Sequence, residues 1–249
     1  MDVQYILSKC DHTLLRQDAA SDDIMSACDQ GIKYKVATVC IAPCHVSGAV
    51  KYCGGALKVS TVIGFPNGYN AGSVKIFEAE NAIKSGASEL DMVINIPMLK
   101  DRYFGKIRDE INAIKDVCEN RVLKVIIETC LLSDDEKKTM CEIVSGSRAD
   151  YIKTSTGFAA CGATREDISL LRKYCDSRIK IKAAGGISTL RDAEDFLSLG
   201  ADRLGTSRII PLVIEQESEN ESNIKEEPEN DRYAPKLNVT KIGGIEGEY

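Results

Sequence analysis

The sequence lacks any long apolar run and has little proline. None of its hydrophobic stretches approaches the ~20 residues of a membrane-spanning helix, so we expect no membrane-spanning segment. Six prolines and a 43% hydrophobic content are not typical of a collagen-like or globally disordered chain. The length of 249 residues suits one α/β barrel better than two small domains.

Clusters of basic residues are also absent. The net charge is −6, and residues 215–249 carry ten acidic and four basic residues, so the first 214 residues carry 28 of each sign. Nucleic acids and anionic membranes are bound through clustered lysine and arginine. We therefore expect a small-molecule function, with no nucleic-acid or membrane partner.

Residues 1–16 contain acidic residues and show no small-residue cleavage site after an apolar core, which favours a cytoplasmic protein. The ten cysteines are scattered singly, which predicts free thiols rather than a disulfide framework. The nearest approach to a metal pattern is Cys40, Cys44, His45 and Cys53, which lacks the paired C-x2-C spacing of structural zinc sites. We expect no metal and no cofactor.

Short β-rich apolar segments alternate along the chain with longer segments of helical periodicity, and this order predicts βα units. The segments predicted to be strands are 8–14, 35–42, 57–65, 89–96, 122–129, 150–156, 178–184 and 202–207. Amphipathic helices are predicted at 73–86, 106–119, 133–146, 164–176 and 189–200.

Eight parallel strands with helices between them, over about 200 residues, have the order and size of an α/β fold of the (β/α)8 TIM-barrel class. A doubly wound open sheet is the alternative, but neither G-x-G-x-x-G nor G-x4-G-K-[ST] occurs. We predict one barrel domain over residues 1–214. Residues 215–249 are predicted to form an acidic, flexible C-terminal tail that ends in Tyr249.

Three charged residues stand in otherwise apolar strands. Lys153 and Lys182 lie late in their predicted strands, and Asp91 lies between Leu90 and Met92. Catalytic groups of barrels project from the C-terminal ends of the strands, so we expect these three side chains to meet in one cavity. The alternative is a buried ion cluster that only fills the barrel, although apolar residues replace such clusters at little cost in stability.

Two lysines beside a carboxylate suit Schiff-base chemistry. A free lysine is only about 0.04% neutral at pH 7, and only the neutral amine attacks a carbonyl. Burial and a second ammonium group both lower a lysine pKa. We therefore predict that one lysine is the nucleophile, while the other stays protonated, pairs with the aspartate and moves protons without a metal.

Glycines follow the seventh and eighth predicted strands, at Gly185, Gly186 and Gly205. Small residues at these loops allow backbone N–H groups to approach an anion, and the loops after strands 7 and 8 are the recurrent phosphate site of this fold. A phosphorylated aldehyde or sugar is the predicted substrate.

Four segments resemble those of the deoxyribose-phosphate aldolase family, in the same order, within about residues 7–211. They are Lys153–Phe158 (KTSTGF), Lys182–Ile187 (KAAGGI), Glu89–Val93 (ELDMV) and Asp11–Leu15 (DHTLL). The resemblance implies that Lys153 forms the Schiff base with acetaldehyde and that Lys182 perturbs it. It further implies that Asp91 works with Lys182 in proton transfer through water, supported by Asp11.

The resemblance also implies reversible, metal-free cleavage of 2-deoxy-D-ribose 5-phosphate to D-glyceraldehyde 3-phosphate and acetaldehyde, by a homodimer. Tyr249 would reach the site as a proton donor and acceptor. Where some members carry a phosphate-binding lysine, this chain has Phe158, and Arg208 is a candidate replacement. The residues expected to hold phosphate are Gly157, Gly185, Gly186, Gly205 and Ser207.

Some features stay open. Lys180 shares a strand face with Lys182 and has no assigned role. Cys40 near the barrel mouth is expected to be inert, and His12 and His45 are expected to be structural. Two other functions remain as alternatives: a Schiff-base aldolase or transaldolase acting on a ketose phosphate, and a catalytically silent barrel that binds phosphorylated metabolites.

Overall fold

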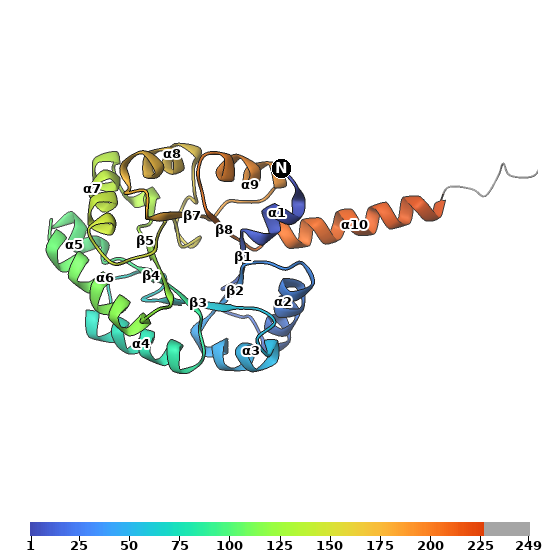
Figure 1. Cartoon of the computed structure of the whole chain (residues 1–249), viewed down its shortest axis with the longest axis horizontal. Coiled ribbons are helices and arrows are strands. Elements are labelled where there is room, and N and C mark those ends of the chain that lie inside the picture. The colour runs from blue at the N-terminus through green and yellow to red at the C-terminus, as the bar shows by residue number, and fades with distance from the viewer. Residues whose placement is uncertain (227–249) are drawn as a thin grey trace, which may run out of the picture. The chain divides into compact units, whose positions relative to one another are not determined.

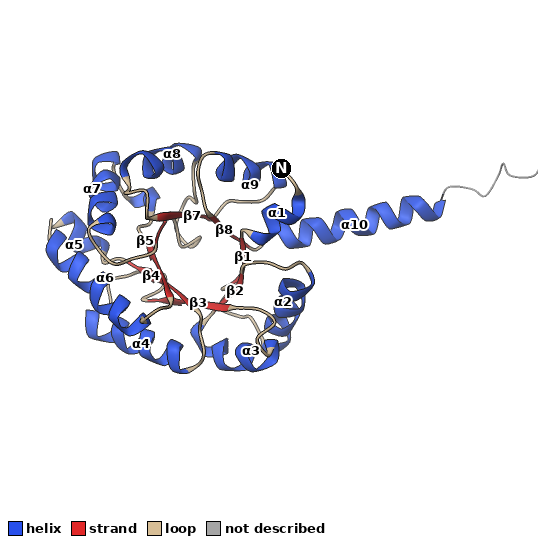
Figure 2. Cartoon of the chain, in the orientation of Figure 1, coloured by secondary structure: helices blue, strands red, loops and turns tan. Residues whose placement is uncertain are grey.

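Eight parallel strands form a closed barrel in which each strand pairs with its neighbours in sequence and β8 pairs with β1. The computed structural model describes the backbone of residues 1–226 and the side chains of residues 1–219. Helices surround the ring of strands on its outer side (Figures 1 and 2). The predicted TIM barrel is confirmed.

The strands are short. They are β1 (Cys10–Leu14), β2 (Thr38–Ile41), β3 (Val59–Ile63), β4 (Glu89–Val93), β5 (Val122–Ile126), β6 (Tyr151–Lys153), β7 (Lys180–Ala184) and β8 (Arg203–Thr206). All eight predicted strands exist, although most end before the predicted limits. Strand β4, for example, stops at Val93 because Asn95 caps the next helix and Pro97 stands in its first turn.

The α-helices are α1 (Val3–Ser8), α2 (Ser21–Lys33), α3 (Val46–Cys53), α4 (Gly72–Lys84), α5 (Ile96–Lys100), α6 (Phe104–Cys118), α7 (Asp134–Ser145), α8 (Arg165–Tyr174), α9 (Leu190–Ser198) and α10 (Ile209–Glu226). Two short 3-10 helices, η1 (Pro43–His45) and η2 (Thr129–Leu131), follow β2 and β5. The five predicted helices correspond to α4, α6, α7, α8 and α9. The sequence analysis did not predict the others.

The core lies between the strands and the covering helices. Strands β2, β3 and β4 are buried along their whole length, because one face of a barrel strand meets the interior and the other meets a helix. Helix α6 buries Ile107, Ile111 and Ile114, which share one face at helical spacing. This packing fixes the positions of the strands, and therefore of the side chains at their C-terminal ends.

The chain divides into two units, Met1–Val213 and Ile214–Tyr249. Helix α10 continues into the acidic segment as far as Glu226, where no helix was predicted. Glutamate and glutamine have favourable helix propensity, which accounts for this difference. The remainder of the predicted tail, with Tyr249, lies outside the described residues. Within residues 1–226, no helix is long and apolar enough to cross a membrane.

We predict that Ile114→Ala lowers the free energy of unfolding by about 2–5 kcal/mol, because it leaves a cavity between α6 and the barrel. Ile114 is fully buried, whereas Ile32 on α2 is 36% exposed, so Ile32→Ala is the matched control with a much smaller loss. Urea titrations of both variants measure the difference. Equal losses would contradict the packing described for α6.

Candidate active site

A carboxylate at the centre of the barrel joins three lysines. The Oδ2 atom of Asp91 accepts hydrogen bonds from Lys153 Nζ and Lys182 Nζ, each at 2.7 Å. Its Oδ1 atom accepts one from Lys124 Nζ at 2.8 Å. Asp91 and its three partners are buried. The structure therefore brings together the two lysines and the aspartate that the sequence analysis selected, and it adds Lys124.

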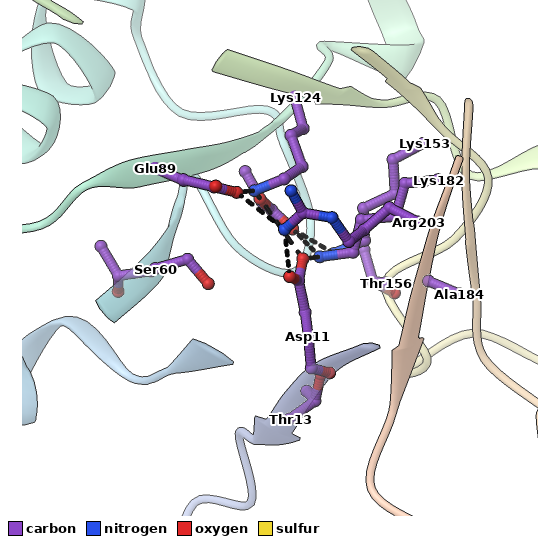
Figure 3. Close-up of polar contacts among 12 residues, drawn as sticks. Asp11, Thr13, Ser60, Glu89, Lys124, Lys153, Thr156, Lys182, Ala184 and Arg203 are labelled. Carbon is purple, nitrogen blue, oxygen red and sulfur yellow. Dashed lines mark hydrogen bonds and ion pairs between the residues drawn. The ribbon is translucent and has the colours of Figure 1, made fainter. Parts of the chain in front are cut away.

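Further ion pairs join this cluster to Asp11, Glu89 and Arg203 (Figure 3). Asp11 pairs with Lys182, and its Oδ1 accepts hydrogen bonds from Arg203 Nη1 at 2.6 Å and from the Thr38 hydroxyl at 2.8 Å. Glu89 Oε2 lies 2.6 Å from Lys124 Nζ and 3.2 Å from Arg203 Nη1. Seven charged side chains from six strands thus form one continuous set of ion pairs, which we call the buried ion network. Its members are Asp11, Glu89, Asp91, Lys124, Lys153, Lys182 and Arg203.

Strand register places these groups at matching heights. Lys153 on β6 pairs in register with Lys182 on β7, and Asp91 on β4 pairs with Lys124 on β5. Side chains alternate between the two faces of a strand, so residues paired in register share a face. The single charged positions inside these apolar strands therefore meet in the barrel interior.

The pKa values of the two lysines named from the sequence are shifted in opposite directions. Burial lowers the pKa of Lys153 and the Lys182 cation adds to this, while Asp91 opposes them, and the net shift is downward. Burial alone would also lower the pKa of Lys182, but Asp11 and Asp91 outweigh it and the pKa is raised. Lys153 is therefore the amine that loses its proton more readily.

The carboxylates of Asp91 and Asp11 remain ionised. Burial alone would raise the pKa of Asp91, but the three surrounding lysines hold it well below its ordinary value. The pKa of Asp11 is likewise lowered, because the cations of Lys182, Lys124 and Arg203 outweigh the effect of burial. Lys124 keeps its proton, since Asp91, Asp11 and Glu89 raise its pKa against the effect of burial.

A cavity of about 780 Å³ opens at the C-terminal ends of the strands, and Lys153 lines it. Asp11, Asp91 and Lys182 are fully buried and do not line it. The predicted phosphate-binding residues all line the cavity: Gly157, Gly185, Gly186, Gly205 and Ser207. Arg16 and Arg208 line the same cavity and bring positive charge to it.

Two of these glycines have no room for a side chain. Gly185 has φ +81°, and a Cβ atom there would lie 2.9 Å from the Cα of Gly162. A Cβ at Gly205 would lie 3.0 Å from both Ala184 Cβ and Lys182 Cε. The cavity wall on this side is therefore bare backbone, which an anion can approach closely.

The comparisons with known proteins agree with this geometry. A model of the DeoC/LacD family of aldolases matches residues 6–204. The chain belongs to this family. A curated deoxyribose-phosphate aldolase from Streptococcus pyogenes serotype M4 is 48% identical over 222 residues, covering 89% of this chain and 100% of the relative.

Solved structures of the family share the fold. A candidate deoxyribose-phosphate aldolase from Coccidioides immitis superimposes with a TM-score of 0.83 at 38% identity, covering 87% of each chain. The deoxyribose phosphate aldolase of Aeropyrum pernix, described as tetrameric, gives a TM-score of 0.77 at 27% identity and covers 87% of this chain and 93% of that one. The aldolase family and its barrel are thus shown by both sequence and structure.

Glu128 is a residue of this aldolase site that the sequence analysis missed. It has φ +54°, a strained backbone conformation for a residue other than glycine, and it is 3% exposed. Its carboxylate accepts hydrogen bonds from the backbone N–H of Thr156 at 3.2 Å and from the Thr156 hydroxyl at 2.5 Å. Glu128 thereby fixes the loop that carries Gly157 and Phe158 into the cavity wall.

The residues left open by the sequence lie as follows. Lys180 is the exposed first residue of β7 and lies over the ring of Tyr151. It shares the strand face of Lys182 but lies at the start of the strand, in solvent.

Burial raises the pKa of Cys40 and keeps its thiol protonated. His12 Nε2 contacts Gln30 at 2.8 Å, and His45 Nε2 contacts the Ala19 carbonyl at 3.2 Å. Among the described side chains, no group of three or more His, Cys, Asp or Glu could hold a metal ion.

Phe158, at the position of the expected phosphate-binding lysine, lies edge-on to Phe65 with ring centroids 5.2 Å apart. It therefore supplies an apolar wall to the cavity. Arg208, the candidate replacement for that lysine, lines the same cavity.

We predict that Asp91→Asn changes how stability depends on pH. A carboxylate whose folded pKa is lowered stabilises the fold above its unfolded pKa of about 3.9, and this contribution is lost as the pH falls. Between about pH 4 and 3, the unfolding free energy of the parent should therefore fall more steeply than that of the variant, by up to about 1.4 kcal/mol per pH unit.

Urea titrations at several pH values in this window measure the slopes. Asp18→Asn is the control, because the Asp18 side chain is 80% exposed and lies outside the network. A variant slope equal to that of the parent would contradict the ionised state described for Asp91.

Proposed function

We propose that this aldolase cleaves 2-deoxy-D-ribose 5-phosphate reversibly to D-glyceraldehyde 3-phosphate and acetaldehyde through a Schiff base on Lys153. One observation carries the proposal. Of the three lysines around Asp91, Lys153 alone both lines the cavity and has a lowered pKa. The names of the curated relatives support the substrate.

The reaction would begin with the neutral Lys153 amine attacking C1 of the open-chain sugar. Loss of water gives a protonated imine, which accepts the electron pair released when the C2–C3 bond breaks. The C3 hydroxyl gives up its proton, and the three-carbon aldehyde phosphate leaves. The remaining enamine takes a proton at C2, and hydrolysis of the imine releases acetaldehyde and restores the amine.

Protonated Lys182 and ionised Asp91 would serve these proton transfers. Asp91 Oδ2 lies 2.7 Å from the Nζ atoms of both Lys153 and Lys182. Asp91 would stabilise positive charge on the imine nitrogen, Lys182 would disfavour a proton on the free amine, and both would exchange protons with the substrate through water. Asp11 holds Lys182 from the other side. Tyr249 is proposed as a further proton donor and acceptor.

The sugar phosphate would rest on the bare backbone of Gly157, Gly185, Gly186 and Gly205, with the Ser207 hydroxyl near the start of α10. A helix N-terminus and free N–H groups favour a dianion. Arg208 would add the positive charge that other family members obtain from a lysine.

Assembly and location are part of the proposal. We expect a homodimer, which light scattering would distinguish from the tetramer described for the relative from Aeropyrum pernix. We also expect the enzyme to act in the cytoplasm, where its ten free thiols would stay reduced.

We predict that acetaldehyde with a hydride reductant fixes a two-carbon adduct on Lys153, and that deoxyribose 5-phosphate gives the same adduct. Peptide mapping by mass spectrometry locates it. Lys153→Met should carry no adduct, whereas Lys180→Met, which removes an exposed lysine, should label as the parent does. A chain that forms no adduct at Lys153 would be a silent binding barrel.

Dihydroxyacetone phosphate is the comparison donor in the same experiment. The proposal expects no adduct from it at Lys153, because the site would take a two-carbon aldehyde. Labelling by dihydroxyacetone phosphate instead of acetaldehyde would identify an aldolase or transaldolase acting on ketose phosphates.

We predict that Arg208→Ala raises KM for deoxyribose 5-phosphate about 10- to 100-fold, since a charge-assisted hydrogen bond contributes about 1.5–3 kcal/mol. The value of kcat should change little, because Arg208 would bind the phosphate equally in substrate and transition state. Initial-rate kinetics separate the two constants. A fall in kcat at unchanged KM would rule out this role for Arg208.

A further inference from the structure

The buried ion network contains one more cation than it has anions. Its cations are Lys124, Lys153, Lys182 and Arg203, and its carboxylates are Asp11, Glu89 and Asp91. Buried charge without a partner is costly, so the loss of one proton is favoured. Arginine does not lose its proton in proteins, so a proton lost from the network would come from one of the three lysines.

The contacts select which lysine that is. Lys124 contacts both Glu89 and Asp91, and Lys182 contacts both Asp11 and Asp91. Lys153 contacts Asp91 alone, and it faces the cavity. The lysine with one carboxylate partner is therefore the one whose charge the network supports least.

Arg203 and Glu89 lie at the first residues of β8 and β4, the end of the barrel opposite the cavity. The side chain of Arg203 is 13% exposed there, over the ring of Tyr151. Arg203 is held by Asp11 and Glu89, and each of these carboxylates also contacts a lysine of the network. Arg203 thus occupies carboxylate oxygens that the lysines would otherwise share.

We propose that Arg203 and Glu89 are positioning residues that act on the protonation of the Lys153 amine in opposite directions from the far end of the barrel. Neither touches the cavity. Arg203 supplies the excess positive charge that disfavours a proton on Lys153, and Glu89 limits that excess by holding Arg203 and Lys124. The inference rests on the proposed role of Lys153 as Schiff-base nucleophile.

The groups that face these residues set the sign of each effect. Lys153 on β6 faces Asp91, Lys182 and the protonated thiol of Cys40. Arg203 faces Asp11, Glu89, Tyr151 and the thiol of Cys10, which burial keeps protonated by raising its pKa. Removing a cation from this set favours the protonated form of Lys153, and removing a carboxylate favours its neutral form.

The test follows the rate of adduct formation at Lys153 with acetaldehyde and cyanoborohydride as a function of pH, measured by intact mass. The acid limb is the part of this profile in which the rate rises with pH as Lys153 loses its proton. Arg203→Met leaves three cations with three carboxylates, so the acid limb should move about one unit toward higher pH. At a pH on the limb, the rate of the variant should then be roughly tenfold lower than that of the parent. Glu89→Gln should move the limb in the opposite direction.

Two further variants separate charge from packing. The double variant Glu89→Gln/Arg203→Met restores an excess of one cation, so its limb should return to that of the parent. Arg203→Lys keeps the cation and should also keep the parental limb. Lys180→Met is the matched control, because it removes an exposed cation over the same Tyr151 ring but outside the network, and it should not move the limb.

Opposite shifts that cancel in the double variant support the inference. Shifts in the same direction, or no shift, while Lys153 still forms the adduct would overturn it and leave the proposed function intact. Absence of any adduct in the parent would instead overturn the function. If Arg203→Met does not fold, a Glu89→Gln limb that stays in place or moves to higher pH overturns the inference.

Discussion

Seven charged side chains inside a barrel must neutralise one another, and the interior of this molecule is organised around that requirement. Burial of each charge costs several kcal/mol, which only close pairing offsets. Asp91 meets this requirement by accepting hydrogen bonds from three lysines, and Asp11 by accepting from a lysine, an arginine and a threonine. The same arrangement leaves Lys153 with the fewest partners, which supports its proposed role as the reactive amine.

This reasoning favours function over simple filling of the barrel. Apolar residues of similar volume would pack the interior at least as well. A set of ion pairs that leaves one amine underpaired at the floor of a glycine-walled cavity has a chemical use that an apolar core lacks. Membership of the DeoC/LacD aldolase family agrees with that use.

Much of the architecture could be predicted from the sequence, because alternating apolar and amphipathic segments report directly on burial. Strand ends were less predictable, since Asn95 and Pro97 stop β4 through local hydrogen bonding that periodicity does not show. Helix α10 continues through a segment whose acidity suggested a flexible tail. The acidic composition of this segment indicates that it contacts solvent, but such a composition does not exclude a helix.

The site was predictable where one charge interrupts an apolar strand, as at Lys153, Lys182 and Asp91. Lys124 gives the same signal in Val122–Ile126 and could have been selected on it. Glu89 and Arg203 begin their strands, where charged residues are ordinary, and only the closure of the barrel brings them together. The backbone strain at Glu128 has no counterpart in the sequence pattern.

Lys153 and its charged partners all belong to strands, whereas Gly157, Gly185, Gly186 and Ser207 lie in the connections after them. Hydrogen-bonded strands of a closed barrel have little freedom to shift, while connecting loops tolerate substitution and insertion. The charges around the Lys153 amine and the glycine-lined wall of the cavity are therefore encoded in separate parts of the chain. Loop sequences can change which sugar enters while the strands keep the same chemistry available to it.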